Sequence, residues 1–341
     1  DKYNPALTRT ARNNFKLLLD EVRNEPQPKG KIISDIVTAI HKRNLAHKIA
    51  LVATEIYNGK DEGFNEIRKI LDTQEEEPIE DISVTTNIGE LMKLVDVTTK
   101  WKFNLPTLHE RVTGIGDGNL TIIFARPETG KTAFWINLVA GMDGFASQGA
   151  NIHALINEEP AVRTQMRLIN AWTGLDREEI QENMDMATQK WAEIRQNIKL
   201  FDTVDWSIDD IDSHLAVHKP DILVIDQLDK VNVGGTFARG DEKLRAIYTG
   251  TRELAKRRNC SIIAISQASA DAHNKLEISF DMMENSKTGK AAEADLVIGV
   301  GKRSDLGEAS ERSICVSKNK ITGWHGTIHC NINDRLSRYV V

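Results

Sequence analysis

Residues 120–136 leave few folds open to this 341-residue chain. An apolar run, Leu120–Ala125, is followed by a short turn and then by Gly130-Lys131-Thr132 at the start of a run with helical character. A strand, a tight turn and a helix in this order are typical of a P-loop, in which backbone N–H groups and the positive end of the helix hold phosphate oxygens. The alternative is a chance Gly-Lys-Thr at a helix N-terminus, where Gly and Thr are favoured. The preceding strand favours the P-loop and predicts an α/β nucleotide-binding domain.

The turn departs from the usual GxxxxGK[ST] pattern at one position, because Ala125 stands where the first Gly is expected. In this interpretation Lys131 meets the β- and γ-phosphates of ATP, and the Thr132 hydroxyl meets a Mg²⁺ ion. Glu128 is unusual there, since a carboxylate near an anion costs free energy, and we expect its side chain to point outward. The residues expected to bind the cofactor are Arg126, Pro127, Glu128, Thr129, Gly130, Lys131 and Thr132.

From about Trp101 onward, short β-rich runs alternate with helical segments, which is the pattern of βαβ units. The pattern predicts an α/β fold with a central, mostly parallel sheet and helices on both faces. In the helix after the P-loop, Trp135, Ile136 and Val139 are expected in the core. The candidate strands are Leu120–Ala125, Ile152–Ile156, Lys199–Phe201, Ile222–Ile225, Ser261–Ser266, Leu296–Val300, Ser313–Val316 and Thr327–Ile332.

Three polar side chains follow candidate strands, at the sheet edge where ligands bind in open α/β folds. Asp226 is the last residue of an apolar run, which is the position of the Mg²⁺-binding carboxylate in a Walker B strand. The alternative is an ordinary turn residue, because turns also favour Asp. Glu158, in an acidic pair with Glu159, is the candidate for activating water, although Glu is also favoured in the first turn of a helix. Gln267 is placed to sense a γ-phosphate or orient water; the alternative is an ordinary loop residue.

Composition and charge restrict the function classes. Forty-four Lys and Arg residues against fifty Asp and Glu residues give a net charge of −6, which excludes a polybasic nucleic-acid coat and requires any nucleic-acid contact to be local. The three cysteines show neither paired zinc-ligand spacing nor a disulfide framework, which indicates a reducing compartment. No apolar run has the length of a membrane span, and no signal-peptide pattern opens the sequence, so we expect an intracellular protein with no membrane partner.

A pair of histidines, His214 and His218, lies four residues apart on a candidate helix and could share a metal ion. The sequence offers no third ligand, so a solvated helix face is the favoured interpretation.

The part of the chain before the α/β domain has a different pattern of apolar residues. Apolar residues recur at helical spacing over residues 34–71, between the breakers Glu25–Gly30 and Glu75–Pro78. A single amphipathic stripe needs a partner, which a neighbouring domain or subunit must supply. The first residue is Asp1 rather than Met, which is compatible with a fragment of a longer protein. The predicted organisation is a helical N-terminal region with a linker helix (1–80), a linker (81–100) and the α/β domain (101–341).

Taken together, the motifs resemble the RecA-like core of DnaB-type replicative helicases more closely than that of RecA or RadA recombinases. Ala125–Thr132 is similar to the family's Ala-Arg-Pro-x-x-Gly-Lys-Thr, which explains the missing Gly, and Glu158-Glu159-Pro160 is similar to its Glu-Met-Pro segment with the catalytic Glu. Ser207–Ile211, Ser266-Gln267 and Glu293–Leu296 follow in the family order. The resemblance covers about Trp101–Val341. The segment 34–71, with Lys42-Arg43 and Ile49, resembles more weakly the region that packs on the adjacent subunit.

The resemblance implies a homo-hexameric ring that holds ATP between subunits and single-stranded DNA in a central channel. The channel loops would be residues 228–241 and residues 268–292, which are long, polar and basic in places, as loops that follow a nucleic-acid backbone should be. Each basic residue is equally well explained as a solvated loop cation. The candidate DNA-binding residues are Lys230, Arg239, Lys275, Lys287 and Lys290.

The family also places a Lys and an Arg, two residues apart, against the neighbouring subunit's ATP. Lys318 matches the Lys, but Lys320 stands where the Arg finger should be. Lys supplies the charge without the planar fork of Arg, so a Lys finger should be weaker, or another residue such as Arg303 takes the role. A surface Lys pair beside an edge strand is the plain alternative. The catalytic residues that the resemblance implies are Glu158, Lys131, Gln267, Lys318 and Lys320.

The leading functional prediction is an ATP-driven translocase on single-stranded DNA, the motor of a replicative helicase, located in the cytoplasm of a bacterium or of a phage-infected host. A primase and a helicase loader are expected partners, and a phage origin is suggested by the short N-terminal part. Two alternatives stay open. One is a recombinase-like filament protein on the same core. The other is a nucleotide-gated module that binds or loads single-stranded DNA with little ATP turnover. Lys320 and Glu128 are the residues that favour this alternative.

Overall fold

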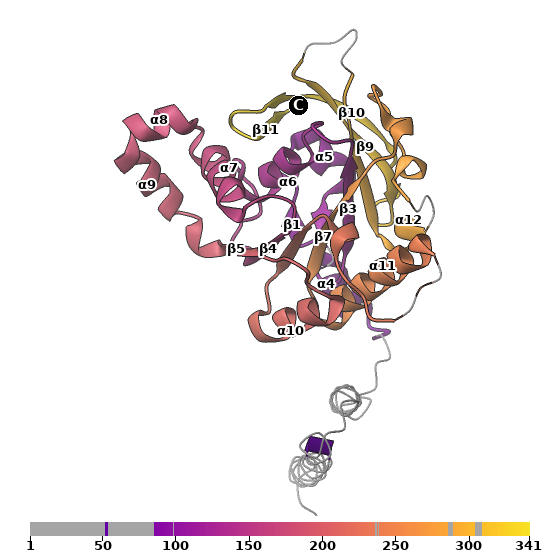
Figure 1. The fold of residues 1–341 in the computed structure, drawn as a ribbon. Coiled ribbons are helices and arrows are strands. Elements are labelled where there is room, and N and C mark those ends of the chain that lie inside the picture. Colours follow the sequence, from indigo (N-terminus) through magenta and orange to yellow (C-terminus); the bar gives the residue numbers. More distant parts are fainter. Residues whose placement is uncertain are drawn as a thin grey trace, which may run out of the picture. The chain divides into compact units, whose positions relative to one another are not determined.

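A nine-stranded sheet forms the centre of the domain that the structure describes (Figure 1). The chain divides into two units, residues 1–84 and residues 85–341, and the second holds this sheet. In the segment 34–71 only Val52 and Ala53 are described, and both are helical. The domain boundaries at residues 80 and 100 stay predictions. The computed structural model describes residues 52–53, 85–97, 99–235, 237, 239–285, 289–303 and 309–341.

The strands of the large sheet are β3 (Leu120–Ala125), β4 (Ile152–Ile156), β5 (Ile198–Asp202), β6 (Ile222–Asp226), β7 (Ser261–Gln267), β8 (Leu296–Gly301), β9 (Glu311–Asn319), β10 (Gly326–Asn333) and β11 (Arg338–Val340). Their order across the sheet is β11-β10-β9-β8-β3-β7-β6-β4-β5. The strands from β8 to β5 run parallel, whereas β9, β10 and β11 extend the β8 edge in antiparallel pairing. The predicted α/β class with a mostly parallel sheet is confirmed.

Every strand expected from the sequence is present, most of them longer by a residue or two at one or both ends. Both faces of the central strands are covered, and every residue of β3, β4 and β6 is buried. Strands of this kind are mostly apolar, which makes them easy to recognise in the sequence. The short strands β11, β1 (Trp101–Lys102) and β2 (Gly114–Ile115) were not expected; β1 and β2 pair with each other outside the large sheet.

Helices cover both faces of the sheet, as expected. One face packs against α5 (Pro106–Val112), α6 (Lys131–Ala140) and α7 (Ala161–Thr173), and the other against α10 (Ile208–His218), α11 (Gly240–Arg257) and α12 (Gly289–Glu293). Alternation along β3 divides its side chains between these layers, because successive side chains of a strand point to opposite faces.

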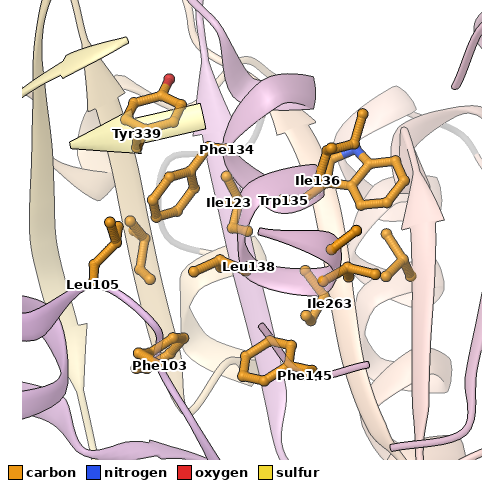
Figure 2. Packing of buried hydrophobic residues seen from close by; sticks show 14 of the residues in the cluster. Phe103, Leu105, Ile123, Phe134, Trp135, Ile136, Leu138, Phe145, Ile263 and Tyr339 are labelled. Atoms are coloured by element: carbon orange, nitrogen blue, oxygen red, sulfur yellow. The ribbon is translucent and has the colours of Figure 1, made fainter. Parts of the chain in front are cut away.

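The α6 side of the core is rich in aromatic residues (Figure 2). Phe134 and Trp135 are fully buried there together with Ile136 and Val139, which confirms the expected core role of this helix. The T-shaped contact of Phe134 with Tyr339, with ring centroids 5.2 Å apart, joins α6 to β11. The helix that carries the P-loop is therefore fixed by packing along its whole length.

The remaining helices are α4 (Ile88–Val97), α8 (Arg177–Glu182) and α9 (Met184–Ala192), with 3₁₀ turns at Arg195–Asn197, Leu228–Lys230, Ala270–Ala272 and Phe280–Met282. Asp176 caps α8 and Ser207 caps α10, each in a capping box with the residue three positions later. Helices α8 and α9 extend beyond α7 at the β5 edge (Figure 1). Across the described residues, every helix is too short or too polar to cross a membrane.

Candidate active site

The P-loop turn joins β3 to α6, as the sequence predicts. Gly130 forms the N-cap of α6 with a left-handed φ of 107°, a conformation that L side chains rarely adopt. A Cβ on Gly130 would also lie 2.6 Å from the Tyr339 Oη and 2.8 Å from the Ile332 Cδ1. Both backbone conformation and space therefore require glycine at this position. Glu128 is exposed, which agrees with the expected outward orientation, although the residue also lines the pocket described below.

Two side chains from the antiparallel edge of the sheet donate hydrogen bonds to backbone carbonyl oxygens of the P-loop. Arg312 on β9 is buried and donates from Nε to the Thr129 carbonyl oxygen at 2.7 Å. Tyr339 on β11 donates its hydroxyl to the Gly130 carbonyl oxygen at 3.0 Å. Sequence reasoning missed both residues, because their partners lie far away along the chain and no motif marks them.

An ion pair joins the P-loop to the end of β4. The Lys131 Nζ lies 2.9 Å from the Glu158 Oε2, and the Lys131 side chain is 8% exposed against 33% for Glu158. The structure thus brings together the expected phosphate-binding Lys and the expected water-activating Glu. The Glu158 carboxylate accepts one of the three N–H donors of the Lys131 ammonium group.

The neighbouring Glu159 has a different set of contacts. Its Oε1 accepts from the Thr164 hydroxyl at 3.2 Å and from the Arg167 guanidinium at 3.1 Å, both on α7. Glu159 is therefore tied to α7, the helix that follows it, whereas Glu158 contacts Lys131 of the P-loop. The two members of the acidic pair thus have different contacts.

Asp226 ends β6 next to the Lys131–Glu158 pair. The residue is 1% exposed, and its Oδ1 is buried without a hydrogen-bond partner. Burial raises its pKa to about 6; Lys131 opposes this shift, and the carboxylates of Glu158 and Glu159 add to it. A buried carboxylate oxygen without a donor is costly in the free protein and is available to a cation.

These residues share one pocket of about 440 Å³, at the edge of the sheet where the carboxyl ends of β3, β4 and β6 meet. Thr132 and Asp226 both line this pocket, and hydroxyl and carboxylate oxygens are hard ligands that suit Mg²⁺. Asp334 and Ser337, from the turn between β10 and β11, also line it and were not expected. The lining residues are Pro127, Glu128, Gly130, Lys131, Thr132, Ala133, Glu158, Glu159, Arg167, Asp226, Asp334 and Ser337.

Arg126, Thr129 and Gln267 are outside the pocket lining. Arg126 donates to the Ala268 carbonyl oxygen at 3.2 Å, and Thr129 is buried beside the Arg312 guanidinium. Gln267 is the last residue of β7 and lies opposite Ala125 in the β3 register, so it stands beside the base of the P-loop. The expected contact of Gln267 with a γ-phosphate stays a prediction.

The two finger candidates lie at the end of β9 and just beyond it, away from this pocket. Lys318 donates to the Ala291 and Ala292 carbonyl oxygens at the end of α12, and burial lowers its pKa. Lys320 is exposed, with its Nζ 3.9 Å from the Asp295 Oδ1. Neither contacts the nucleotide pocket of its own chain, and Arg303 does not line that pocket. A contact of any of them with a neighbouring subunit's nucleotide stays a prediction.

The expected DNA-binding residues divide into exposed and buried ones. Lys230, Arg239 and Lys275 are exposed, and Arg239 forms an ion pair with Asp241. Lys287 lies outside the described residues. Lys290 has no exposed side-chain area and forms an ion pair with Asp229 inside the domain. The expectation that Lys290 binds DNA is therefore wrong for this conformation, because a fully buried ammonium group cannot reach a phosphate.

The histidine pair of α10 has a third neighbour. His153 on β4 is buried, and its Nδ1 lies 2.8 Å from the His214 Nε2. Burial lowers the pKa of both groups to about 4, so they are neutral near pH 7 and share one proton in a hydrogen bond. No group of His, Cys, Asp or Glu within the described ranges has the arrangement of a metal site.

Comparisons with known proteins agree with this geometry. Residues 102–340 match the model of the DnaB-like helicase C terminal domain. Replicative DNA helicase DnaB of Buchnera aphidicola subsp. Baizongia pistaciae is 22% identical over 95% of this chain and 77% of its own length. The protein of the same name from Haemophilus influenzae is 21% identical over 93% of this chain and 68% of its own length.

Two solved structures share the fold. One, described as a DnaB-like replicative helicase and its interactions with primase, has a TM-score of 0.69 and 17% identity, over 90% of this chain and 77% of that one. The other, described as an ATPase domain, has a TM-score of 0.62 and 18% identity, over 75% of this chain and 99% of that one.

Proposed function

Because this chain belongs to the family of DnaB-like helicases, whose members are ATP-dependent DNA helicases, we propose that the 440 Å³ pocket binds ATP and Mg²⁺ and drives translocation on single-stranded DNA. The observation that carries the proposal is the meeting of Lys131, Glu158 and Asp226 in one pocket at the end of the P-loop. Each supplies a different requirement of phosphoryl transfer: a cation for phosphate, a carboxylate for water and an oxygen ligand for a metal.

Lys131 and the N-terminus of α6 bind the β- and γ-phosphates, and Thr132 and Asp226 hold Mg²⁺. When bound, Mg²⁺ neutralises the charge that develops on the phosphate oxygens. The unpartnered Asp226 oxygen fits this role, because a cation supplies the partner that the protein lacks. Gln267 stands at the base of the P-loop, where it can respond to the γ-phosphate.

Glu158 changes partner when ATP binds. In the nucleotide-free protein it is held by Lys131 at 2.9 Å. Phosphate oxygens carry more charge than one carboxylate and take over the ammonium group, which leaves Glu158 free to accept a proton from the attacking water. The ion pair thus keeps the base inactive until the substrate is present.

Family membership supports a proposal for the assembly and the DNA contacts. We assign to the chain a homo-hexameric ring with single-stranded DNA in the channel, contacted by the exposed residues Lys230, Arg239 and Lys275. Lys318 and Lys320 act on the nucleotide of the neighbouring subunit, and primase and a helicase loader are partners of the ring. The organisation expected before the motor domain, with boundaries at residues 80 and 100, stays a proposal; within it the structure describes the helix α4 (Ile88–Val97).

The test compares two adjacent carboxylates. Glu158→Gln should reduce DNA-stimulated ATP hydrolysis at least ~100-fold, as expected for loss of a general base, and should abolish strand displacement. It should also bind ATP as tightly as the wild type or more tightly, since the competitor for Lys131 loses its charge. Glu159→Gln is the matched control and should lose less than about tenfold, because the Glu159 carboxylate is held by Thr164 and Arg167 of α7 rather than by Lys131.

Equal losses in the two variants would contradict the assigned roles. Absence of hydrolysis in the wild type, together with ATP-dependent DNA binding, would favour the nucleotide-gated module instead. Filaments rather than rings by negative-stain microscopy would favour the recombinase-like alternative.

A further inference from the structure

Lys290 is held in a buried cluster that no step of the proposed hydrolysis uses. Its Nζ lies 2.8 Å from the Asp229 Oδ1 and 3.1 Å from the Ser266 Oγ. Asp229 in addition accepts from the Tyr248 hydroxyl at 2.8 Å and from the Ser266 hydroxyl at 2.9 Å. The ammonium group also lies 5.4 Å from the centre of the Tyr248 ring. These four side chains, the Lys290 cluster, satisfy one another fully, which a buried charge requires.

The position of the cluster is informative, because the first candidate DNA loop begins at it and the second ends at it. Asp229 lies in the 3₁₀ turn Leu228–Lys230, three residues after Asp226, where the first loop begins. Lys290 lies on α12, where the second loop ends. Ser266 immediately precedes Gln267 at the end of β7. The cluster thus joins the stems of the two loops beside the strand ends that carry the nucleotide pocket.

Helix α12 has further ties that make it a rigid unit. Glu293 accepts from the Thr249 hydroxyl of α11 at 3.2 Å, and α11 and α12 lie side by side (Figure 1). Lys318 donates to the Ala291 and Ala292 carbonyl oxygens at the other side of the helix. A displacement of Asp229 would therefore be passed to α12 through Lys290 rather than absorbed in a flexible loop.

We propose that Lys290 is a positioning residue whose ion pair with Asp229 makes the two DNA loops move together with the Asp226 strand end, so that nucleotide state and DNA affinity are coupled through this contact. The inference rests on the proposed function, since it needs a protein that binds both ATP and DNA. Lys290 itself contacts neither. In a low-dielectric interior the ion pair and its hydrogen bonds have one favourable geometry, which an apolar contact would not impose.

The experiment measures coupling separately from stability. The affinity for a fluorescent oligothymidylate is measured by anisotropy with a non-hydrolysable ATP analogue and with ADP, and the ratio of the two affinities is the coupling. For the wild type we expect a ratio of at least about tenfold, within the usual range of coupling between sites. Lys290→Met keeps the length of the side chain, removes the charge and should bring the ratio to within about twofold of unity.

Two further variants keep the test decisive. Lys290→Met alone leaves the Asp229 carboxylate, whose side chain is only 17% exposed, without its cation and should destabilise the domain. The double variant Lys290→Met with Asp229→Asn has no uncompensated charge, and the new amide can accept from the Tyr248 hydroxyl with its oxygen and donate to the Ser266 Oγ with its NH2 group. Its urea midpoint should therefore recover while the coupling stays lost. Asp212→Asn, which removes the contacts of Asp212 with Arg257 and Arg258 at the other end of α11, is the control and should lower stability but keep the coupling.

Recovery of coupling together with stability in the double variant would overturn the proposal, because the cluster would then be merely structural. Wild-type coupling in Lys290→Met would overturn it as well. Failure of the wild type to bind ATP or DNA would instead refute the proposed function, which separates the two results.

Discussion

Substitution of Asp226 by Asn should stabilise the nucleotide-free protein while it abolishes metal-dependent hydrolysis. Burial raises the pKa of Asp226 from 3.8 to about 6. Between these values the folded state binds more protons than the unfolded state, so the free energy of unfolding falls as pH rises through this window. At 1.36 kcal/mol per pKa unit, the penalty is about 3 kcal/mol above pH 7 and about half of that at pH 5.

Asn at this position carries no charge and so lacks this pH-dependent penalty. Its unsatisfied amide costs about 1–3 kcal/mol, which offsets part of the gain at neutral pH but does not vary with pH. The difference in unfolding free energy between variant and wild type should therefore fall by about 1–2 kcal/mol from pH 8 to pH 5. This change with pH is a sharper measure than the stability difference at any single pH.

The assay is urea denaturation followed by circular dichroism at several pH values between 5 and 8, without Mg²⁺ or nucleotide. Asp212→Asn serves as the control, since it loses hydrogen bonds of 2.7 and 3.3 Å to Arg258 and Arg257 and should only lower stability. A difference between Asp226→Asn and wild type that is flat with pH, or that grows toward acid, would refute the reasoning. With ADP and Mg²⁺ added, the wild type should gain more stability than the variant, because ligand binding stabilises only the state that binds it.

Two other substitutions test residues around the pocket. Tyr339→Phe removes only the hydroxyl that donates to the Gly130 carbonyl oxygen at 3.0 Å, and it should weaken ATP binding about fivefold, the effect of one hydrogen bond, as measured by isothermal titration calorimetry. Unchanged affinity would show that the backbone of the P-loop keeps its shape without that bond. Lys320→Arg supplies a planar fork and should raise kcat several-fold if Lys320 reaches the neighbouring nucleotide. An unchanged kcat would shift the finger role to another residue such as Arg303.

The sequence predicts those parts of the molecule that depend on neighbouring residues in the chain. The parallel strands are recognisable as apolar runs, because they are buried on both faces. The P-loop is recognisable because a strand, a turn and a helix follow one another. Strand β11 has three residues, of which Val340 is exposed, so neither its length nor its pattern distinguishes it from a loop.

The errors and omissions concern side chains whose partners come from elsewhere in the fold. Lys290 stands in a long polar stretch, where a lysine is usually solvated, and its burial depends on Asp229 and Ser266 from other elements. No sequence motif marks Arg312, because its partner is the backbone carbonyl oxygen of Thr129, which lies far away along the chain. The sequence placed Glu158 and Lys131 at the same edge of the sheet and favoured Glu158 over Glu159, whereas the ion pair of Glu158 with Lys131 and the contacts of Glu159 with α7 are known only from the structure.

The contact of Tyr339 with Gly130 spans 209 positions of the chain, which has a consequence for how the domain forms during synthesis. A ribosome adds about 5–20 residues per second, so Tyr339 follows Gly130 by about 10–40 s. Through that interval Gly130 lacks the side chain that holds its carbonyl oxygen. The nascent β3 and α6 therefore depend mainly on their apolar packing until β11 is synthesised.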